Sequence, residues 1–406
     1  MENDMGIRDK KICVLGLGYI GLPTASLLGT KGYQVHGVDT VGEVVDTINQ
    51  GRIHITEPDL DVLVKSAVQS GNLKAGKEPQ PADVFIIAVP TPFKDGHQPD
   101  LSHVEAAARM IAPHVRAGNL VILESTSPVG TTEDVIARIL REHGHRVGTD
   151  VFVAYCPERV LPGRILTELV ENDRIVGGVG ETSTEEAVSF YKTFVRGEVY
   201  ATNARTAELT KLAENSFRDV NIAFANELSL ICDQEGINVW ELVSLANRHP
   251  RVNILRPGPG VGGHCIAVDP WFVVSRAPAL ARLIRVAREV NDGKPDWVIG
   301  KVRTSAEKFK KAVIGCLGLA FKADVDDLRE SPAVGIVRRL KEEQIGELLI
   351  AEPYLTRHKE FDLLPYEEVV SRADIILVLV DHKQFRKLRA ADLKEKIVID
   401  TRGVII

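Results

Sequence analysis

Three glycines between an apolar segment and a helical pattern are the feature that most constrains how this chain can fold. Residues 11–15 are apolar enough for a buried strand, and residues 22–31 have a helical pattern. Gly16, Gly18 and Gly21 lie between them. With this spacing the first glycine makes a tight turn, the second lets a phosphate approach the backbone, and the third lets helix and strand pack. The segment predicts a dinucleotide-binding turn, with an ordinary glycine-rich turn as the alternative.

An acidic residue closes the next predicted strand and narrows the choice of cofactor. Residues 34–38 form that strand, and Asp39 follows it directly. A carboxylate in this position accepts hydrogen bonds from the adenosine ribose and repels a 2′-phosphate. Since no arginine follows Asp39 nearby, the pattern favours NAD over NADP as the cofactor.

Two later apolar segments extend the same sheet. Residues 84–89 and 120–123 are strand-like, and helical patterns alternate with the strands along the chain. This alternation predicts an α/β fold with a doubly wound parallel sheet. Thr91 and Thr126 lie in the loops after these two strands, at the sheet edge where the nicotinamide end of NAD would pass. Plain turn chemistry is the alternative for both loops.

The C-terminal third repeats the pattern of the first. Residues 312–317 are apolar and lead into Gly318, and residues 375–380 and 397–399 are further strand-like segments. Between the two parts, residues 205–235 carry a helical pattern without proline or glycine. The predicted fold is therefore α/β, with two Rossmann-like parallel-sheet domains joined by a long central helix and a helical middle domain.

Cys265 follows a run of glycine and proline that starts at residue 257 and has no core-strand periodicity. Glycines in such number leave backbone N–H groups exposed and let a ligand come close. A cysteine in this position is placed as a nucleophile rather than as a core residue. Asp269, four residues later, could hold or activate a hydrolytic water.

The other cysteines carry less information. Cys13, Cys232 and Cys316 lie inside apolar runs, which favours core positions, whereas the surroundings of Cys156 leave its role open. The spacing of all five fits neither a disulfide framework nor a zinc site, so we expect no metal. Free cysteines of this kind are typical of a reducing cytosol, and we expect a cytoplasmic protein.

Three polar residues share one face of the long helical pattern. Lys211, Asn215 and Arg218 are spaced i, i+4 and i+7, which places them on one side of a helix. Together they would form a receptor for an oxyanion or a phosphate. A solvated helix face is the alternative.

A dinucleotide site combined with a cysteine nucleophile limits the reaction. Oxidation of an alcohol to a carbonyl needs no nucleophile. Oxidation onward to an acid does, because a thiolate captures the aldehyde and the resulting thioester is hydrolysed. Lys211 could stabilise the tetrahedral oxyanion, and Asn215 could donate a second hydrogen bond to it. These residues predict a four-electron oxidation of an alcohol to a carboxylate.

The composition excludes two classes of partner. Lysine and arginine together number 50 and aspartate and glutamate 56, so the formal net charge is −6. A nucleic-acid-binding protein would need a basic face. The longest apolar runs, such as residues 375–380, are far shorter than the roughly 20 residues that a bilayer requires. We expect no nucleic-acid partner and no membrane span.

Six motifs distributed over the chain are shared with a known family. They are residues 16–23, 89–92, 124–130, 211–226, 262–265, and 321–322 together with 327–332. On these motifs the chain resembles the UDP-glucose/GDP-mannose dehydrogenase family over essentially its whole length. Enzymes of this family oxidise the 6-hydroxyl of a UDP- or GDP-sugar to a carboxylate with two NAD.

The resemblance implies an architecture and an assembly. It implies an NAD-binding Rossmann domain at residues 1–204, a helical dimerisation and catalytic domain at 205–303, and a UDP-sugar-binding domain at 304–406. It also implies a homodimer or a higher homo-oligomer. In related enzymes an arginine at the position of Arg251 comes from the neighbouring subunit.

The resemblance further assigns roles to individual residues. The implied catalytic residues are Cys265, Lys211, Asn215, Asp269 and Glu158. The implied NAD-binding residues are Gly16, Gly18, Tyr19, Ile20, Gly21, Asp39, Thr91, Thr126, Thr132 and Arg329. The implied substrate-binding residues are Arg159, Val160, Lys211, Asn215, Arg218, His249, Arg251, Gly262, Phe321, Lys322 and Arg402.

Two segments point to one branch of the family. Residues 156–163 and 247–253 resemble the branch that acts on UDP-N-acetyl-D-mannosamine. The UDP-glucose branch usually has a second acidic residue at the position of Pro162 and a Pro-Lys pair where residues 267–268 are Ala-Val. UDP-N-acetyl-D-mannosamine is therefore the expected substrate, with UDP-N-acetylglucosamine and UDP-glucose as alternatives.

Two other classes of protein remain as alternatives. A two-electron hydroxy-acid dehydrogenase also joins a dinucleotide domain to a helical one, but it needs neither Cys265 nor a second nucleotide sheet. A non-catalytic nucleotide-sugar binding protein would have the same fold. The presence of Cys265, Lys211, Asn215 and Asp269 together argues against this last alternative.

Overall fold

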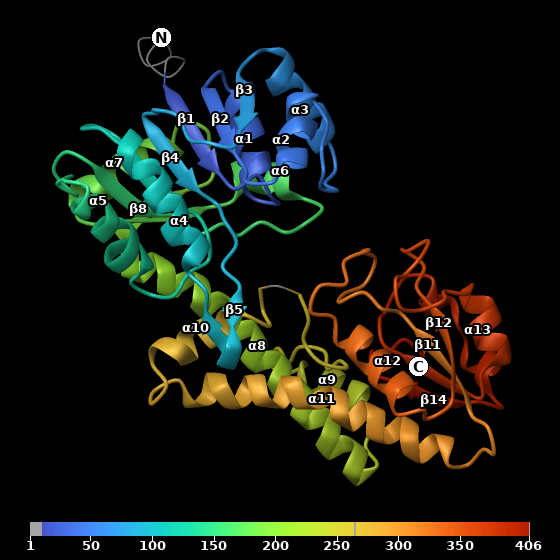
Figure 1. The fold of residues 1–406 in the computed structure, drawn as a ribbon. Coiled ribbons are helices and arrows are strands. Elements are labelled where there is room, and N and C mark those ends of the chain that lie inside the picture. Colours follow the sequence, from blue (N-terminus) through green and yellow to red (C-terminus); the bar gives the residue numbers. More distant parts are fainter. Residues whose placement is uncertain (1–9, 264, 406) are drawn as a thin grey trace. The chain divides into compact units, whose positions relative to one another are not determined.

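The computed structural model describes residues 10–263 and 265–405, and the chain divides into two compact units, Met1–Ala213 and Glu214–Ile406. Helix α8 (Ala204–Glu235) contains the boundary between them (Figure 1). The N-terminal unit holds the larger sheet and the C-terminal unit the smaller one.

The sheet of the N-terminal unit has eight strands in the order β10-β9-β8-β7-β4-β1-β2-β3. Neighbouring strands are parallel except for β8 and β9, which pair antiparallel. This arrangement confirms the predicted doubly wound sheet. The strands are β1 (Lys11–Leu15), β2 (Gln34–Val38), β3 (Leu73–Gly76), β4 (Val84–Ile87), β7 (Leu120–Leu123), β8 (Phe152–Tyr155), β9 (Arg174–Gly178) and β10 (Val199–Asn203).

Helices cover both faces of this sheet. Side chains that alternate along each strand therefore enter two separate cores, one on each face. On β1, Ile12 and Val14 pack into one core, and Cys13 and Leu15 pack into the other. The helices of this unit are α1 (Gly21–Thr30), α2 (Gly42–Asn49), α3 (Leu60–Gln69), α4 (Ser102–Ile111), the π-helix η3 (Thr132–Ala137), α5 (Arg138–Glu142), α6 (Ile165–Glu171) and α7 (Glu181–Tyr191). Its short elements are β5 (Phe93–Lys94), β6 (Gln98–Pro99), η1 (Asp95–His97) and η2 (Ala112–His114).

The C-terminal unit contains a four-stranded parallel sheet in the order β12-β11-β13-β14. Its first strand, β11, lies between β12 and β13, just as β1 lies between β2 and β4. The second nucleotide-type sheet is thereby confirmed. The strands are β11 (Val313–Leu317), β12 (Glu347–Ala351), β13 (Ile375–Val378) and β14 (Ile397–Asp400).

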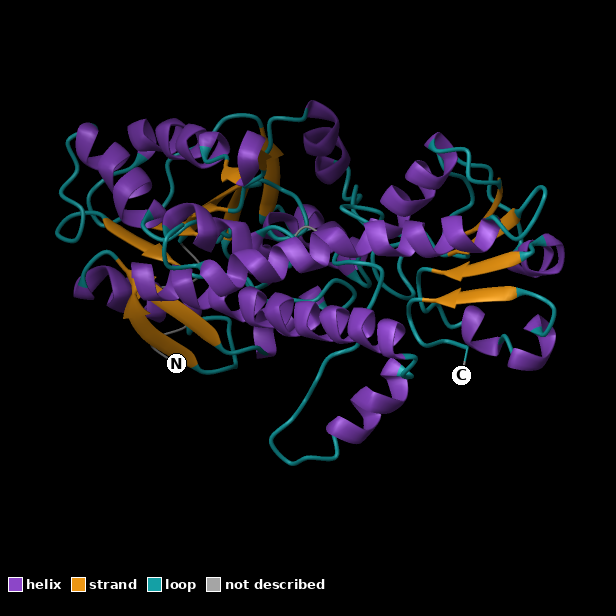
Figure 2. Cartoon of the chain, turned by 90° about the horizontal axis from the view of Figure 1, so that it is seen from below, coloured by secondary structure: helices purple, strands orange, loops and turns teal. Residues whose placement is uncertain are grey.

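Helices α11 and α12 pack on one face of the smaller sheet and α13 on the other, as the two cores of this unit show. In Figure 2 both sheets (orange) are covered by helices (purple). The helices of this unit are α9 (Val239–Ala246), α10 (Asp269–Arg276), α11 (Arg282–Ala306), α12 (Pro332–Glu342) and α13 (Tyr366–Arg372), with the short η4 (Phe385–Lys387) and η5 (Ala390–Leu393).

Predicted and observed boundaries agree closely where the local pattern is strong. The segments expected at 11–15, 34–38 and 120–123 coincide with β1, β2 and β7, and the helix expected at 205–235 begins one residue earlier. The strand expected at 84–89 ends at Ile87, three residues before Pro90, which cannot donate a hydrogen bond to a neighbouring strand.

No helix in the described part of the chain is both long enough and apolar enough to cross a membrane. The same residues contain no group of three or more side chains placed to hold a metal ion.

Candidate active site

The glycine turn after β1 has the geometry that a pyrophosphate requires. Gly16 has a φ of +88°, and a Cβ there would lie 2.6 Å from the carbonyl oxygen of Ala88. A Cβ on Gly21 would lie 1.8 Å from the carbonyl oxygen of Gly16, so close packing requires glycine at both positions. At Gly18 nothing lies within 4 Å of such a Cβ. The side of the turn next to the start of α1 is therefore open to a phosphate.

Asp39 lies at the end of β2, beside this turn. Its Oδ2 accepts a hydrogen bond from the Leu17 N–H at 3.1 Å, and its Oδ1 accepts one from the Val41 N–H at 3.0 Å. The side chain stays partly exposed, so the carboxylate retains lone pairs for ribose hydroxyls. Tyr19 and Ile20, which complete the turn, are also partly exposed. These residues fit the adenosine half of NAD.

The loops that carry Thr91 and Thr126 meet at the carboxyl ends of β4 and β7. Thr91 Oγ1 donates a hydrogen bond to the carbonyl oxygen of Thr126 at 2.6 Å. Ser125 Oγ donates to the carbonyl oxygen of Val89 at 2.7 Å. Side chains thus join two segments about 35 residues apart, and the structure brings these two predicted NAD residues together.

Thr132 has different surroundings from the other two threonines. It begins the π-helix η3, and both its N–H and its hydroxyl donate to Glu208 Oε1, at 2.8 Å and 2.7 Å. The second carboxylate oxygen of Glu208 accepts from the Gly130 N–H at 2.6 Å. Thr132 therefore belongs to a buried hydrogen-bond cluster that joins η3 to α8.

Glu158 lies in a buried cluster of charged and polar groups. Its Oε2 accepts a 2.6 Å hydrogen bond from Arg174 Nη1, and neither side chain is more than 5% exposed. Tyr191 donates to Glu124 Oε1 at 2.7 Å. Burial, together with the charge of Glu158, raises the pKa of Glu124 to about 7. Burial also raises the pKa of Cys156 to about 12, so this thiol stays protonated and belongs to the core.

The two residues after Glu158 follow its conformation. The Arg159 N–H donates to Glu158 Oε1 at 2.7 Å, and the Arg159 guanidinium donates to the carbonyl oxygen of Asp173. Val160 is partly buried and packs against the larger core of this unit. The structure therefore places these two predicted substrate residues next to the predicted catalytic carboxylate.

Cys265 is partly exposed, whereas the other four cysteines are buried, and it lies in the turn four residues before α10 begins at Asp269. The Asp269 N–H donates to the carbonyl oxygen of Cys265 at 2.8 Å, which makes one turn of the two residues. Asn215 Nδ2 of α8 donates to Asp269 Oδ2 at 2.5 Å. Three predicted catalytic residues thus lie in one cluster. His264, part of the motif around the cysteine, lies outside the described residues.

The polar face of α8 is mostly buried. Lys211 and Asn215 are 9% and 7% exposed, and Arg218 is exposed. The alternative of a solvated helix face is therefore wrong for the first two residues. The lysine lies one turn before the asparagine on the same continuous helix.

The loop before Cys265, residues 257–263, is called the glycine loop below. A Cβ on Gly262 would lie 2.6 Å from the carbonyl oxygen of Glu330 and 2.9 Å from Phe321 Cβ. The Gly263 N–H donates to the carbonyl oxygen of Arg329 at 3.1 Å. The glycine loop therefore packs against the segment after β11, and only glycine allows the approach at position 262.

Two further predicted substrate residues lie at this contact. Arg402 Nη1 would be 2.6 Å from a Cβ on Gly258, and Asp381 Oδ1 holds the guanidinium through hydrogen bonds of 2.7 Å and 2.9 Å. The Lys322 ammonium is 5.7 Å from the centre of the Phe321 ring. The C-terminal unit thus presents two cations next to the loop that leads to the candidate nucleophile.

Other predicted residues lie outside these contacts. His249 and Arg251 occupy an exposed turn after α9, where the Arg251 N–H donates to His249 Nδ1 at 3.3 Å. The Arg329 side chain pairs with Asp327 at 2.6 Å. Among the described residues, the hydrogen bonds and close approaches around the glycine loop involve the Arg329 backbone and neither His249 nor Arg251.

A chain of buried amides that the sequence analysis missed holds the other end of the glycine loop. The Gly258 N–H donates to Asn226 Oδ1 at 2.8 Å, and Asn226 Nδ2 donates to Asn291 Oδ1 at 2.8 Å. Asn291 in turn donates to Asp219, which forms a buried ion pair with Arg288 at 2.6 Å. These polar residues interrupt the apolar patterns of α8 and α11, and that interruption is the sequence signal that could have indicated them.

Matches to known families cover nearly all of the chain. Residues 10–195 match the NAD binding domain of the UDP-glucose/GDP-mannose dehydrogenase family, residues 205–293 match its central domain, and residues 315–406 match its UDP binding domain. The chain belongs to the UDP-glucose/GDP-mannose dehydrogenase family. It is an NAD-dependent nucleotide-sugar dehydrogenase, and NAD is its cofactor.

Relatives in this family match the chain from end to end. An NDP-N-acetyl-D-galactosaminuronic acid dehydrogenase from Ralstonia nicotianae is 58% identical, covering 100% of this chain and 98% of the relative. A UDP-N-acetyl-D-mannosamine dehydrogenase from Yersinia pestis is 54% identical, covering 97% and 98%. The solved structure of a UDP-D-ManNAc dehydrogenase from Pyrococcus horikoshii is 44% identical with a TM-score of 0.89, covering 98% and 96%. The fold and the family predicted from the sequence are thereby confirmed.

Proposed function

We propose that this protein oxidises the 6-hydroxyl of UDP-N-acetyl-D-mannosamine and yields UDP-N-acetyl-D-mannosaminuronate. The observation that carries the proposal is the hydrogen-bonded cluster of Cys265, Asp269 and Asn215, in which the first two residues follow the glycine loop in the chain. A two-electron dehydrogenase needs no such nucleophile. The choice of sugar rests on the resemblance of residues 156–163 and 247–253 to that branch and on relatives of that name.

In the proposed reaction the 6-hydroxyl gives a proton to a base and a hydride to the first NAD, which leaves an aldehyde. The thiolate of Cys265 adds to the aldehyde carbon and forms a thiohemiacetal. This intermediate gives its hydride to the second NAD and becomes a thioester. Water then breaks the carbon–sulfur bond. The sum is one alcohol, two NAD⁺ and one water converted to one carboxylate, two NADH and three protons.

The proposed catalytic residues would divide this work. Lys211 would stabilise the tetrahedral oxyanion, and Asn215 would donate a second hydrogen bond to it. Asp269 would hold the hydrolytic water, and its hydrogen bond with Asn215 orients both groups. Glu158, held by Arg174, completes the proposed catalytic set.

The proposed binding residues are those that the resemblance assigns, distributed over three domains at 1–204, 205–303 and 304–406. The NAD set is Gly16, Gly18, Tyr19, Ile20, Gly21, Asp39, Thr91, Thr126, Thr132 and Arg329. The substrate set is Arg159, Val160, Lys211, Asn215, Arg218, His249, Arg251, Gly262, Phe321, Lys322 and Arg402.

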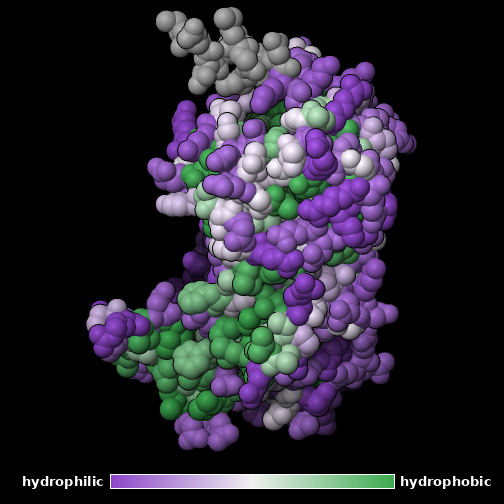
Figure 3. All heavy atoms as spheres, turned by 90° about the vertical axis from the view of Figure 1, so that its left-hand side faces the viewer, coloured by the Kyte–Doolittle hydropathy of each residue, from purple (hydrophilic) through white to green (hydrophobic). Residues whose placement is uncertain are grey.

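We propose a homodimer formed through an apolar surface of α8 and α11. Phe217, Phe224 and Ile231 repeat every seven residues along α8 and are 50% to 69% exposed. Leu283 and Val286 at the start of α11 are 68% and 52% exposed. Figure 3 shows apolar side chains (green) gathered in the lower part of that view, at the height of α8 and α11 in Figure 1. Large apolar patches of this kind mark protein interfaces.

The proposed compartment is the cytoplasm, because the five cysteines of the chain are free and free cysteines are typical of a reducing compartment.

A second substrate is favoured by a specific observation. Relatives 57% and 58% identical to this chain are named for NDP-N-acetyl-D-galactosaminuronic acid. An N-acetyl-D-galactosamine nucleotide is therefore the second candidate. UDP-N-acetylglucosamine and UDP-glucose remain the further alternatives.

The deciding experiment is an NAD-reduction assay across a panel of these UDP-sugars, in which NADH formed per sugar consumed is counted. We expect two NADH per sugar and the highest kcat/KM with UDP-N-acetyl-D-mannosamine. Cys265→Ala is the matched control and should form no carboxylate. One NADH per sugar would contradict the four-electron reaction, and binding without turnover would indicate a nucleotide-sugar binding protein. A higher kcat/KM with another sugar would change the substrate and leave the chemistry intact.

A further inference from the structure

The segment after β11 carries Phe321 and Lys322, and the protein holds it from both sides. The segment begins at Leu319, directly after Gly318, and turns at Asp324, whose φ is +61°. The Phe321 ring lies against the glycine loop, since a Cβ on Gly263 would be 3.0 Å from it. The position of this segment therefore sets the position of the proposed substrate residues next to the glycine loop.

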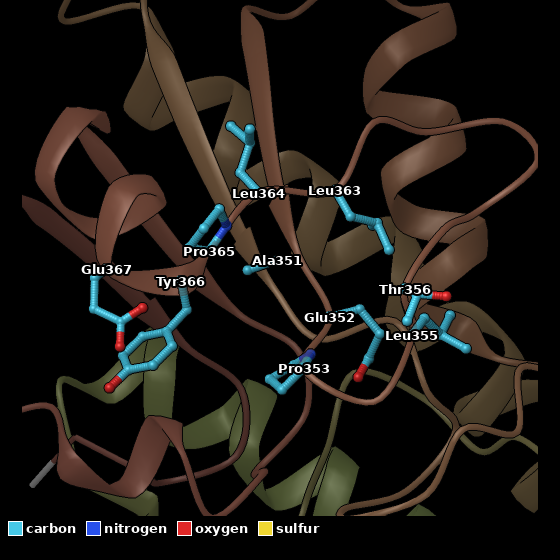
Figure 4. A pocket seen from close by; sticks show the side chains of 10 residues that line it. All are labelled: Ala351, Glu352, Pro353, Leu355, Thr356, Leu363, Leu364, Pro365, Tyr366 and Glu367. Carbon is cyan, nitrogen blue, oxygen red and sulfur yellow. The ribbon is translucent and has the colours of Figure 1, made fainter.

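A carboxylate holds the start of the segment. Glu352 Oε2 accepts hydrogen bonds from the Leu319 N–H at 2.7 Å and the Ala320 N–H at 3.0 Å. Its Oε1 accepts from the Tyr354 N–H at 3.0 Å. Figure 4 shows Glu352 beside Pro353 at the end of β12, where it lines a cavity of about 280 Å³. The side chain itself has no exposed surface.

A histidine holds the other end of the segment and is joined to the same carboxylate. The Asp324 N–H donates to His382 Nδ1 at 2.9 Å, and His382 Nε2 is 3.1 Å from Glu352 Oε2. Because Nδ1 accepts a hydrogen bond, the ring proton is assigned to Nε2, which donates it to Glu352. The ring is completely buried, with the Tyr354 ring 5.0 Å away. One connected pair therefore fixes both ends of the segment that contains Phe321 and Lys322.

A carboxylate at the matching position of the N-terminal unit gives a comparison for Glu352. Asp39 follows β2 and accepts from the Leu17 N–H, just as Glu352 follows β12 and accepts from the Leu319 N–H. Asp39 remains partly exposed and can still meet a ribose. Each hydrogen bond that Glu352 accepts comes from a protein group, and its side chain has no exposed surface. Glu352 is therefore not placed to bind a nucleotide.

We propose that Glu352 and His382 are positioning residues for the substrate, which hold Phe321 and Lys322 against the glycine loop so that the uridine diphosphate moiety can bind. The inference rests on the proposed function, because that function makes Phe321 and Lys322 substrate residues. Neither Glu352 nor His382 contacts the substrate in this scheme. Their effect is transmitted through the backbone N–H groups of residues 319, 320 and 324.

Two substitutions at His382 separate positioning from simple stability. His382→Ala removes both hydrogen bonds, whereas His382→Asn places an amide oxygen near the position of Nδ1 and retains the bond from the Asp324 N–H. Val369→Ala is the matched control, because Val369 is completely buried in a core of the same unit and its side chain cannot hydrogen-bond to the segment. Glu352→Gln tests the carboxylate.

The measurement is calorimetric titration of the full-length protein with UDP alone and, separately, with NAD, followed by steady-state kinetics. We expect each hydrogen bond that is lost and not replaced to weaken UDP binding by roughly tenfold. His382→Ala loses both of its hydrogen bonds, and Glu352→Gln should weaken UDP binding comparably. His382→Asn should recover about half of the loss on a logarithmic scale, and NAD affinity should not change. In kinetics, the KM for the UDP-sugar should rise more than kcat falls.

Several results would overturn the proposal. Parent-like UDP affinity in both His382→Ala and Glu352→Gln would show that the pair does not position the segment. An equal loss in Val369→Ala, or no recovery in His382→Asn, would reduce the effect to stability. Failure of the parent protein itself to bind UDP would instead contradict the proposed function.

Discussion

Cys265 and Cys156 show how surroundings decide the chemistry of one side chain. Cys156 is completely buried beside Glu124 and Tyr191, and burial raises its pKa to about 12. Cys265 is partly exposed, follows the glycine loop, and shares a turn with Asp269. Only the thiolate is a nucleophile, so burial disfavours Cys156 as a nucleophile, and we propose that role for Cys265 alone.

The variant Cys265→Ser tests the covalent step. We expect no detectable uronate, because a serine hydroxyl at neutral pH is a far weaker nucleophile than a thiolate. Binding of NAD and of the UDP-sugar should stay within a few-fold of the parent, since the sulfur supplies chemistry rather than affinity. Mass analysis of the product and titration with each ligand provide the measurements. Carboxylate production at the parent rate would end the covalent hypothesis.

Glu124 gives the fold a dependence on pH. Burial and the charge of Glu158 raise its pKa to about 7 from an ordinary 4.5. The native state therefore binds this proton more tightly than the unfolded chain. Its contribution to the free energy of unfolding is complete below about pH 4.5 and is lost as the pH rises through about 7.

The variant Glu124→Gln should remove this contribution, because glutamine does not titrate. Between pH 5 and 8 we expect the parent to lose on the order of 2–3 kcal/mol of stability that the variant does not lose. Urea unfolding of both proteins at several pH values measures the difference. Parallel curves for parent and variant across this range would show that Glu124 does not hold the proton.

At the scale of elements, β2 ends beside the turn between β1 and α1, and Asp39 directly after β2 is the carboxylate proposed to bind the cofactor. Asp39→Ala should weaken NAD binding by roughly 1.5–3 kcal/mol and relax the discrimination against NADP, because charge-assisted bonds to the ribose are lost. Asp39→Asn is the control for the internal bond to the Leu17 N–H, since its amide oxygen can still accept it. Unchanged NAD affinity and selectivity in Asp39→Ala would show that this residue does not contact the ribose.

Lys211 on α8 is proposed to stabilise the transition state, whereas Arg251 and Lys322 are proposed to bind the substrate before the reaction begins. Lys211→Ala should lower kcat by about 10²–10³, the range found when an oxyanion donor is removed. Arg251→Ala and Lys322→Ala should mainly raise the KM for the UDP-sugar, because the diphosphate is charged before the reaction begins. Steady-state kinetics with saturating NAD separate the two effects. A raised KM with intact kcat in Lys211→Ala would make Lys211 a binding residue.

At the scale of the whole molecule, the exposed apolar surface of α8 and α11 predicts self-association. Phe224→Asp places a charge within this surface and should convert the dimer to a monomer, because the charge would have to lose its hydration in the interface. Val62→Asp is the control, since Val62 is a 65% exposed apolar residue on α3. Light scattering after size-exclusion chromatography measures the mass. A parent protein that is already monomeric would contradict the proposed dimer.

The amino-acid sequence by itself determined the features that depend on neighbours along the chain. The strand at 11–15, the glycine turn after it and the strand that ends before Asp39 were predicted because apolar runs, turn residues and the following helix are all local signals. The long helix α8 was predicted because no proline or glycine interrupts residues 205–235. Strand β12 was not predicted, and its place beside β11 emerges only from the assembled sheet.

Only the tertiary structure decided which side chains are buried and which distant groups meet. Thr91 bonds to Thr126, about 35 residues away in sequence, and Phe321 packs against Gly262 from a different part of the chain. The raised pKa of Cys156 and the use of Glu352 as an internal acceptor belong to the same class. Burial and hydrogen-bond partners are set by strand order and by packing across the sheet, and neither is encoded in the residues adjacent to these side chains.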